Sequence, residues 1–386
     1  MNDPFKPLRH RFRTWRNIRR LKRETAYYRE QFRLSGLAIP GGADIIAIVS
    51  KRFPRQLPRP KGALNILSIY HDYNWEAASL GPSLAAFGTV RHIDWRDPQL
   101  AGGRQPGENG WLETMNAGLI RTVQEWNAGQ PFDAMFTYLS GEQLTPACLV
   151  GLRSIGAPIV NLALNDKEGF VGRVRKGHAA GSRDICRHFD LCWTSTQDAL
   201  EKYVVEGATP LYLPEGANPA VHRAYDEQKL YDVSFVGQCY GQRPEVISQL
   251  KAAGIRIEVF GPGWPNGPLP TEEMVRTWSR SRINLGFGGV ADFKKTFCLK
   301  GRDFEVPMSG GLYLTEHHDE LLPYYDIDRE IVTYTDFDDL LVKIRRLLGN
   351  PAEAESIRKA GRDRALREHT WEMRFEKVFR LLGVLA

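Results

Sequence analysis

Apolar residues along most of this chain form short runs that alternate with longer segments of helical period. Short apolar runs predict strands, and spacings of three and four residues predict the helices between them. The strands predicted in the first half are Leu64–Tyr70, Val90–Trp95, Ala134–Tyr138, Ile159–Leu164, Leu191–Ser195 and Leu211–Leu213. This alternation indicates a parallel sheet covered by helices.

The pattern restarts after Pro214–Pro219, a segment rich in turn residues that we interpret as a hinge. The strands predicted beyond it are Val233–Val236, Ile255–Phe260, Ile283–Phe287, Leu312–Thr315 and Ile331–Tyr334. We therefore expect two Rossmann-like doubly wound domains, residues 63–215 and 216–386, that face each other across a cleft. The last helix is a candidate to cross back to the first domain. A length of 386 residues with 42% hydrophobic residues is ample for two such cores.

Positive charge is concentrated at the N-terminus. Residues 1–33 hold eleven of the 52 Lys and Arg residues and three of the 46 acids, a net charge of +8, so the rest of the chain carries −2. A nucleic-acid enzyme would carry a basic surface on the folded domains themselves, so we expect no nucleic-acid partner.

The same N-terminal segment has an apolar stripe of helical period. Its members are Leu8, Phe12, Trp15, Ile18, Leu21, Tyr28 and Phe32. A basic amphipathic helix over residues 4–33 suits an anionic membrane surface, and a helix whose stripe packs on its own body or on a second subunit is the alternative. Residues 37–62, rich in Pro and Gly, complete an N-terminal region of residues 1–62 as a linker.

The remaining composition bears on the compartment. The sequence has no run of about 18 apolar residues and no secretory signal, and its five cysteines are scattered. We therefore expect a cytoplasmic protein with reduced thiols, peripheral on the inner membrane face if the N-terminal helix binds lipid.

The stretch Val236–Arg243 is the first candidate binding segment. A strand ends in Gly237, a short turn through Gln238 follows, and a helix opens just after Arg243. Free amides at a helix start, together with a guanidinium, predict an anion site that suits a diphosphate. A plain strand–helix turn with a solvated arginine is the alternative.

The stretch Lys300–Gly311 is the second candidate. Lys300 and Arg302 can neutralise phosphate oxygens, and Glu305 can accept two hydrogen bonds from ribose hydroxyls. The alternative is a surface ion-pair group of Lys300, Arg302 and Asp303.

Candidates for acceptor activation lie in the first half. His71 and Asp72 directly follow the first predicted strand, and Asp166 follows the fourth, so all three should lie at the carboxyl edge of that sheet. His71 could act as a general base that Asp72 or another carboxylate orients. A loop histidine bonded to the backbone is the alternative.

These segments, with Tyr313–Glu316 and the downstream Gly361-Arg362 and His369–Trp371, resemble the CgeB-like (spore-maturation-type) glycosyltransferases of the GT-B group. The resemblance runs from about Phe189 to Leu382 and implies that the second domain holds a sugar nucleotide and the first an acceptor. Arg243, Lys300 and Arg302 would contact the diphosphate, and Glu305 the ribose. The full set of donor-binding residues expected is Gly237, Gln238, Arg243, Lys300, Arg302, Glu305, Gly310 and Gly311. The Glu-x7-Glu motif of many retaining relatives is interrupted, because Phe297 stands eight positions before Glu305.

The expected activity is a hexosyltransferase-like transfer from a nucleotide-diphosphate sugar to a glycan, lipid-linked or protein acceptor. Arginine and lysine would stabilise the departing diphosphate, so we expect no cofactor and no metal. Two other functions stay open at this point: a sugar-nucleotide epimerase of GT-B-like fold and a non-catalytic sugar-nucleotide-binding protein.

Overall fold

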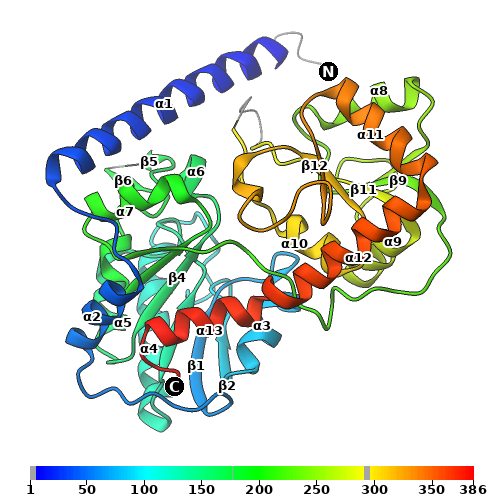
Figure 1. Ribbon diagram of the computed structural model, residues 1–386. Helices are drawn as coiled ribbons and strands as arrows, with labels where there is room; N and C mark the ends of the chain where they lie inside the picture. Colours follow the sequence, from blue (N-terminus) through cyan, green and yellow to red (C-terminus); the bar gives the residue numbers. More distant parts are fainter. Residues whose placement is uncertain (1–5, 176, 291–295) are drawn as a thin grey trace. The chain divides into compact units, whose positions relative to one another are not determined.

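The computed structural model describes residues 6–175, 177–290 and 296–386. The chain divides into two compact units, each with its own parallel sheet (Figure 1). The N-terminal unit comprises Trp15–Pro214 and Arg374–Ala386, and the C-terminal unit comprises Glu215–Met373.

The N-terminal unit is built on a six-stranded parallel sheet of order β2-β1-β3-β4-β7-β8. Its strands are β1 (Leu64–Ile69), β2 (Gly88–Ile93), β3 (Ala134–Thr137), β4 (Ile159–Ala163), β7 (Leu191–Thr194) and β8 (Pro210–Tyr212), with a small β5 (Val174–Arg175) and β6 (His178–Ala179) hairpin. Its helices are α2 (Gly42–Arg52), α3 (Glu76–Ala85), α4 (Trp111–Gly129), α5 (Pro146–Arg153), α6 (Asp166–Gly169) and α7 (Leu200–Val205). All six residues of β1 are buried, as expected for a central strand covered on both faces.

The C-terminal unit repeats the plan with five parallel strands in the order β10-β9-β11-β12-β13. The strands are β9 (Tyr231–Val236), β10 (Ile257–Phe260), β11 (Ser281–Leu285), β12 (Tyr313–Glu316) and β13 (Val332–Tyr334). The helices are α8 (Arg243–Ala252), α9 (Thr271–Arg280), α10 (Gly301–Met308), α11 (Phe337–Gly349) and α12 (Pro351–Glu368). The expectation of two Rossmann-like parallel-sheet domains is thus confirmed.

The last helix, α13 (Trp371–Leu381), joins the end of the chain to the N-terminal unit. Its Phe375 ring lies 5.1 Å from Phe136 of β3 and 5.5 Å from Trp193 of β7, and Phe379 lies 5.1 Å from Phe87. Burial of these aromatic rings holds α13 on the N-terminal sheet. Replacing one such buried Phe by Ala typically costs roughly 3–5 kcal/mol of stability.

The long first helix, α1 (Lys6–Ser35), packs through part of its apolar stripe. Tyr28 is buried, lies 5.5 Å from the Phe170 ring and donates a hydrogen bond of 2.6 Å to Glu206. Nearby, Lys202 pairs with Glu24 at 2.7 Å, and both side chains are almost fully buried. The C-terminal end of this helix therefore packs on the protein's own N-terminal unit, which was the alternative to membrane contact.

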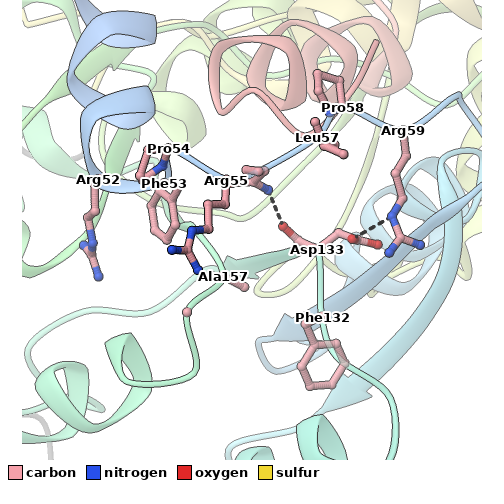
Figure 2. Close-up of a pocket in the computed structure, with 12 residues that line it drawn as sticks. Arg52, Phe53, Pro54, Arg55, Leu57, Pro58, Arg59, Phe132, Asp133 and Ala157 are labelled. Carbon is pink, nitrogen blue, oxygen red and sulfur yellow. Dashed lines mark hydrogen bonds and ion pairs between the residues drawn. The ribbon is translucent and has the colours of Figure 1, made fainter.

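The most evident hollow of the N-terminal unit, about 730 Å³, lies at the amino edge of its sheet (Figure 2). Two of its arginines are already partnered, Arg59 with Asp133 at 2.9 Å and Arg52 with Asp190. Because ligands of parallel α/β sheets bind at the opposite, carboxyl edge, we do not assign the substrate to this hollow.

Candidate functional site

The expected donor segments converge at the carboxyl edge of the C-terminal sheet. Gly237 and Gln238 follow β9, Glu316 ends β12, and both α8 and α10 begin at this edge. An added Cβ at Gly237 would lie only 3.0 Å from Nη1 of Arg302, so the absence of a side chain there lets the α10 arginine approach the end of β9. The structure therefore brings together two segments that are about sixty residues apart in the sequence.

Arg243, the first residue of α8, is held in place by neutral groups. Its side chain is only 4% exposed, and it donates hydrogen bonds of 2.9 Å to the Gln238 carbonyl and 3.0 Å to the Tyr240 hydroxyl. The guanidinium also stacks on the Tyr240 ring, 4.0 Å from its centroid. Burial, and next the nearby Arg302, lower the pKa of Arg243 to about 10, and Tyr240 and Glu316 offset only part of that fall.

Arg302 adds a second guanidinium to the same place. Its Nε is buried and has no hydrogen-bond partner among the described residues. Within those residues, neither Arg243 nor Arg302 has a carboxylate at ion-pair distance. Two neighbouring cations that have no carboxylate at ion-pair distance repel each other, and a bound dianion would offset that repulsion.

Lys300 is the third cation, immediately before α10. Its Nζ donates to Cys298 Sγ at 2.8 Å. Burial alone would lower the pKa of Lys300, but Cys298, Tyr240 and Glu215 outweigh burial and hold the pKa above its ordinary value. The lysine thus stays charged at neutral pH.

Asp303 does not form the surface ion-pair group that was the alternative reading. It is fully buried, accepts 2.7 Å hydrogen bonds from the Tyr313 hydroxyl and from the Lys300 backbone N–H, and so caps the start of α10. Because its two oxygens are used in this way, Lys300 and Arg302 remain available to an anion.

Glu305 lies in the second turn of α10 and is 9% exposed. Its pKa is raised to about 7, chiefly by burial. Arg302 offsets part of this rise, and Asp303 adds to it. His222 Nε2 lies 3.8 Å from Glu305 Oε1. A carboxylate at this edge, beside three cations, fits the expected acceptor of ribose hydroxyl hydrogen bonds.

The structure does not bring Gly310 and Gly311 to this site. They connect the end of α10 to the start of β12, where the Gly311 N–H donates to the Val306 carbonyl and Gly310 adopts a φ of +71°. The amino ends of parallel strands lie at the edge opposite the carboxyl ends, so these glycines serve the turn rather than a donor.

Glu316 is a residue of this edge to which the sequence reasoning gave no role. Its carboxylate accepts from Gln242 Nε2 at 2.5 Å and from the Gly289 N–H at 2.9 Å. Burial raises its pKa, and the Gly289 and Gly288 amides and Arg243 offset part of that rise. An acid directly after the predicted strand Leu312–Thr315 was the signal that could have revealed it.

The carboxyl edge of the N-terminal sheet carries the acceptor candidates. His71 Nδ1 lies 2.8 Å from Asp94 Oδ2, an acid that follows β2, while Asp72 is exposed. The loop after His71 is fixed by Glu76, whose Oε2 accepts the N–H groups of residues 73–75 at 2.9–3.1 Å. Sequence reasoning missed Asp94 because it placed this residue inside the predicted strand Val90–Trp95, whereas β2 ends at Ile93.

Asp166 has a structural environment. It is 2% exposed and accepts hydrogen bonds from Ser182 at 3.0 Å, Thr194 at 2.7 Å and Tyr203 at 2.7 Å. Burial raises its pKa, and these three hydroxyls offset part of the rise. The position after β4 therefore supplies an interior polar network, and we no longer count Asp166 among the acceptor-side candidates.

Metal-binding and membrane-spanning features were sought in the described part of the chain. It holds no group of three or more His, Cys, Asp and Glu side chains placed to bind a metal ion. Its helices are each too short or too polar to cross a lipid bilayer.

Comparison with known proteins identifies the class. Residues 243–380 match a family described as glycosyl transferase-like. Among curated proteins, none matches this sequence. The structure is similar to sucrose-phosphate synthase from Thermosynechococcus elongatus (TM-score 0.60, 13% identity, 83% of this chain and 99% of that one). It is also similar to a glycosyltransferase from Rickettsia africae (TM-score 0.55, 11% identity, 84% of this chain and 98% of that one). A third similar structure is Anabaena HepE in complex with UDP and glucose (0.52, 11%, 83% and 100%).

The fold is therefore that of the GT-B glycosyltransferases, and the family match lies over the unit that carries the cationic site. Together they confirm the expectation that the chain is a glycosyltransferase.

Substitution of Asp166 and of Asp72 should have different effects on the stability of the protein. We expect Asp166→Ala to lower the free energy of unfolding by about 3 kcal/mol, because it leaves three buried hydroxyls without their acceptor. Asp72→Ala, at an exposed position, should change it by less than about 0.5 kcal/mol. Urea unfolding followed by tryptophan fluorescence measures both, and equal stabilities of the two variants would contradict the structural role of Asp166.

Proposed function

We propose that the protein is a CgeB-like glycosyltransferase that transfers a sugar from a nucleotide-diphosphate sugar to a glycan or lipid-linked acceptor. The observation that carries the proposal is the pair of guanidiniums, Arg243 and Arg302, which adjoin without a carboxylate counter-ion in the described chain. A diphosphate supplies the missing negative charge. The complex of the similar HepE with UDP supports this class of ligand.

The donor contacts follow from the positions of the side chains. Arg243, Arg302 and Lys300 bind the diphosphate, and Glu305 accepts the ribose hydroxyls. As the bond between the anomeric carbon and the phosphate oxygen breaks, negative charge grows on the leaving diphosphate. Fixed cations stabilise that charge more in the transition state than in the ground state, so the reaction proceeds without a metal.

The acceptor contacts lie on the N-terminal unit. Asp94 holds His71 through Nδ1, which leaves Nε2 as the nitrogen that receives the proton of the acceptor hydroxyl. The acceptor oxygen then forms the new bond to the anomeric carbon, and the electron pair of the broken bond leaves with the diphosphate.

The exposed face of α1 is the proposed contact with an anionic membrane. Because Tyr28 is buried, lipid contact falls on the exposed positions of the helix, which include Trp15 at 51% and Tyr27 at 57% exposure. Over residues 14–35, where the structure describes the side chains of the helix, the exposed bases are Arg16, Arg19, Arg20, Lys22, Arg23, Arg29 and Arg33. Each base near an anionic surface contributes about 1 kcal/mol of attraction.

Removing one of the paired guanidiniums should slow transfer. We expect Arg243→Ala and Arg302→Ala each to lower kcat/KM by about 10²–10³-fold, the effect of deleting one charge-stabilising group. The assay uses the donor that a thermal-shift screen of sugar nucleotides selects. Arg256→Ala, whose side chain is 86% exposed and pairs with Asp232, is the matched control.

Transfer that is unchanged in both arginine variants would contradict the proposal. The same assay with EDTA should retain activity, because protein cations replace a metal.

The His71–Asp94 pair should affect transfer and leave donor binding intact. We expect His71→Ala to lower kcat by about 10²–10⁴-fold, the usual range for a general base, and Asp94→Asn to have a smaller effect in the same direction. Calorimetric titration with the nucleoside diphosphate should give wild-type affinity in both variants. If His71→Ala transfers sugar at the wild-type rate, another group is the base.

Neutralising the exposed face of α1 should weaken vesicle binding. Three substitutions, Arg16→Gln, Arg19→Gln and Arg23→Gln, should together cost about 3 kcal/mol, or roughly 150-fold, in affinity for phosphatidylserine-containing vesicles. Cosedimentation measures the loss, neutral phosphatidylcholine vesicles are the control, and 0.5 M salt (~4 Å Debye length) should release the wild-type protein. Undiminished binding by the triple variant would refute the membrane contact.

A further inference from the structure

The hinge segment places a second carboxylate beside the proposed ribose acceptor. A Cβ built on Gly301 would lie 3.1 Å from Glu215 Oε2 and also 3.1 Å from Glu305 Oε1. The two carboxylates therefore occupy the space that a side chain at position 301 would need. Glu215 comes from the loop between β8 and β9, whereas Glu305 belongs to α10, so tertiary structure creates the pair.

Several charged or titratable groups lie around this pair. From α10 and the residue before it, Lys300 and Arg302 favour ionisation of Glu215, and Asp303 opposes it. From the loop after the hinge, His222 faces Glu305 through Nε2. His222 Nδ1 accepts the Asn218 N–H at 3.1 Å, and burial lowers the pKa of His222 to about 4, so this histidine is neutral and adds no charge.

Two carboxylates this close cannot both ionise without a cost. Burial first, and Glu305 next, raise the pKa of Glu215 to about 8, and burial raises that of Glu305 to about 7. Such a pair titrates as a unit that keeps one proton over an interval near neutral pH. Lys300 and Arg302 offset only part of the rise in pKa for Glu215, and Arg302 only part of it for Glu305.

We propose that Glu215 is a positioning residue that holds the proton of this pair and thereby keeps Glu305 ionised to accept the ribose hydroxyls of the donor. The inference rests on the proposed function, because it concerns how the donor's ribose is bound. Glu215 itself acts through Glu305 and needs no contact with the substrate.

The proposal sets a pH optimum for donor binding. Below about pH 7 Glu305 is protonated and must release its proton to the solvent when ribose binds, so affinity rises with pH up to that point. Above about pH 8 Glu215 loses its proton, and the second negative charge opposes both Glu305 and the incoming diphosphate, so affinity falls. One proton on each side limits either slope to about tenfold per pH unit.

The test measures affinity for a ribonucleoside diphosphate between pH 5.5 and 9.5 by calorimetry. The probe is whichever of UDP, GDP, ADP and CDP binds the full-length protein. We expect a bell-shaped profile for the wild type. Glu215→Gln, a neutral side chain of the same shape, should keep the acidic limb and lose the alkaline one, so that it binds about tenfold more tightly than the wild type at pH 9.

The 2′,3′-dideoxy form of the same nucleotide separates ribose from phosphate. It carries the same phosphates and lacks the hydroxyls that Glu305 would accept, so its profile should lose the acidic limb due to Glu305. This comparison uses the wild-type protein and so needs no variant to fold.

The outcomes distinguish a failure of the Glu215 role from a failure of the proposed function. Binding of the ribonucleotide with the same alkaline limb in Glu215→Gln and in the wild type would overturn the positioning role and leave the proposed function intact. Profiles of ribo- and dideoxynucleotide that coincide at all pH values would overturn it too. If no nucleoside diphosphate binds at any pH, the proposed function itself fails.

Discussion

The repulsion between Arg243 and Arg302 is the interaction on which the proposed function of this molecule depends. Positive charge is costly to hold in a buried place, and here two guanidiniums adjoin with only neutral oxygen atoms and aromatic rings as their immediate partners. The fold tolerates this because Tyr240, Phe235 and Phe287 present their ring faces to the Arg243 charge. A site of this kind is stabilised by the anion it binds, which couples donor binding to the stability of the C-terminal unit.

The nearby acids explain why the cations stay available. Asp303 is occupied with the start of α10 and the Tyr313 hydroxyl, and Glu316 with Gln242 and the Gly289 amide. Each of these two acids is thus hydrogen-bonded to neutral groups and forms no ion pair with an arginine in the described part of the chain. The local geometry therefore gives Asp303 and Glu316 structural partners and leaves Arg243 and Arg302 without a carboxylate at ion-pair distance among the described residues.

The sequence allowed the fold and most of the cationic site to be predicted, because residues that follow parallel strands share one edge. It failed where a short element carries the chain to the other edge. Helix α10 has eight residues, at a rise of about 1.5 Å each, and so takes the chain about 12 Å from Lys300 to the turn at Gly310 and Gly311. Proximity in sequence therefore suggested a single site that the helix in fact divides.

Asp166 and Asp94 show a second limit. Both follow strands of one sheet, yet Asp166 turns inward to Thr194 and Tyr203, and Asp94 turns to His71 of the neighbouring strand. The position of a residue at the end of a predicted strand shows at which edge of the sheet it lies. It does not show where its side chain points, because that depends on partners from other strands. The same limit hid Glu215, a hinge residue whose nearest acid, Glu305, is ninety residues away in the sequence.

Glu215 directly follows Pro214, the last residue of the N-terminal unit before the hinge, and is itself part of the C-terminal unit. It therefore lies in the same compact unit as α10 and Glu305. Moving one carboxylate of a close pair changes the proton affinity of the other, because their mutual repulsion depends steeply on distance in a buried place. The proton of the pair therefore depends on the local backbone that places Glu215 beside α10 within the C-terminal unit.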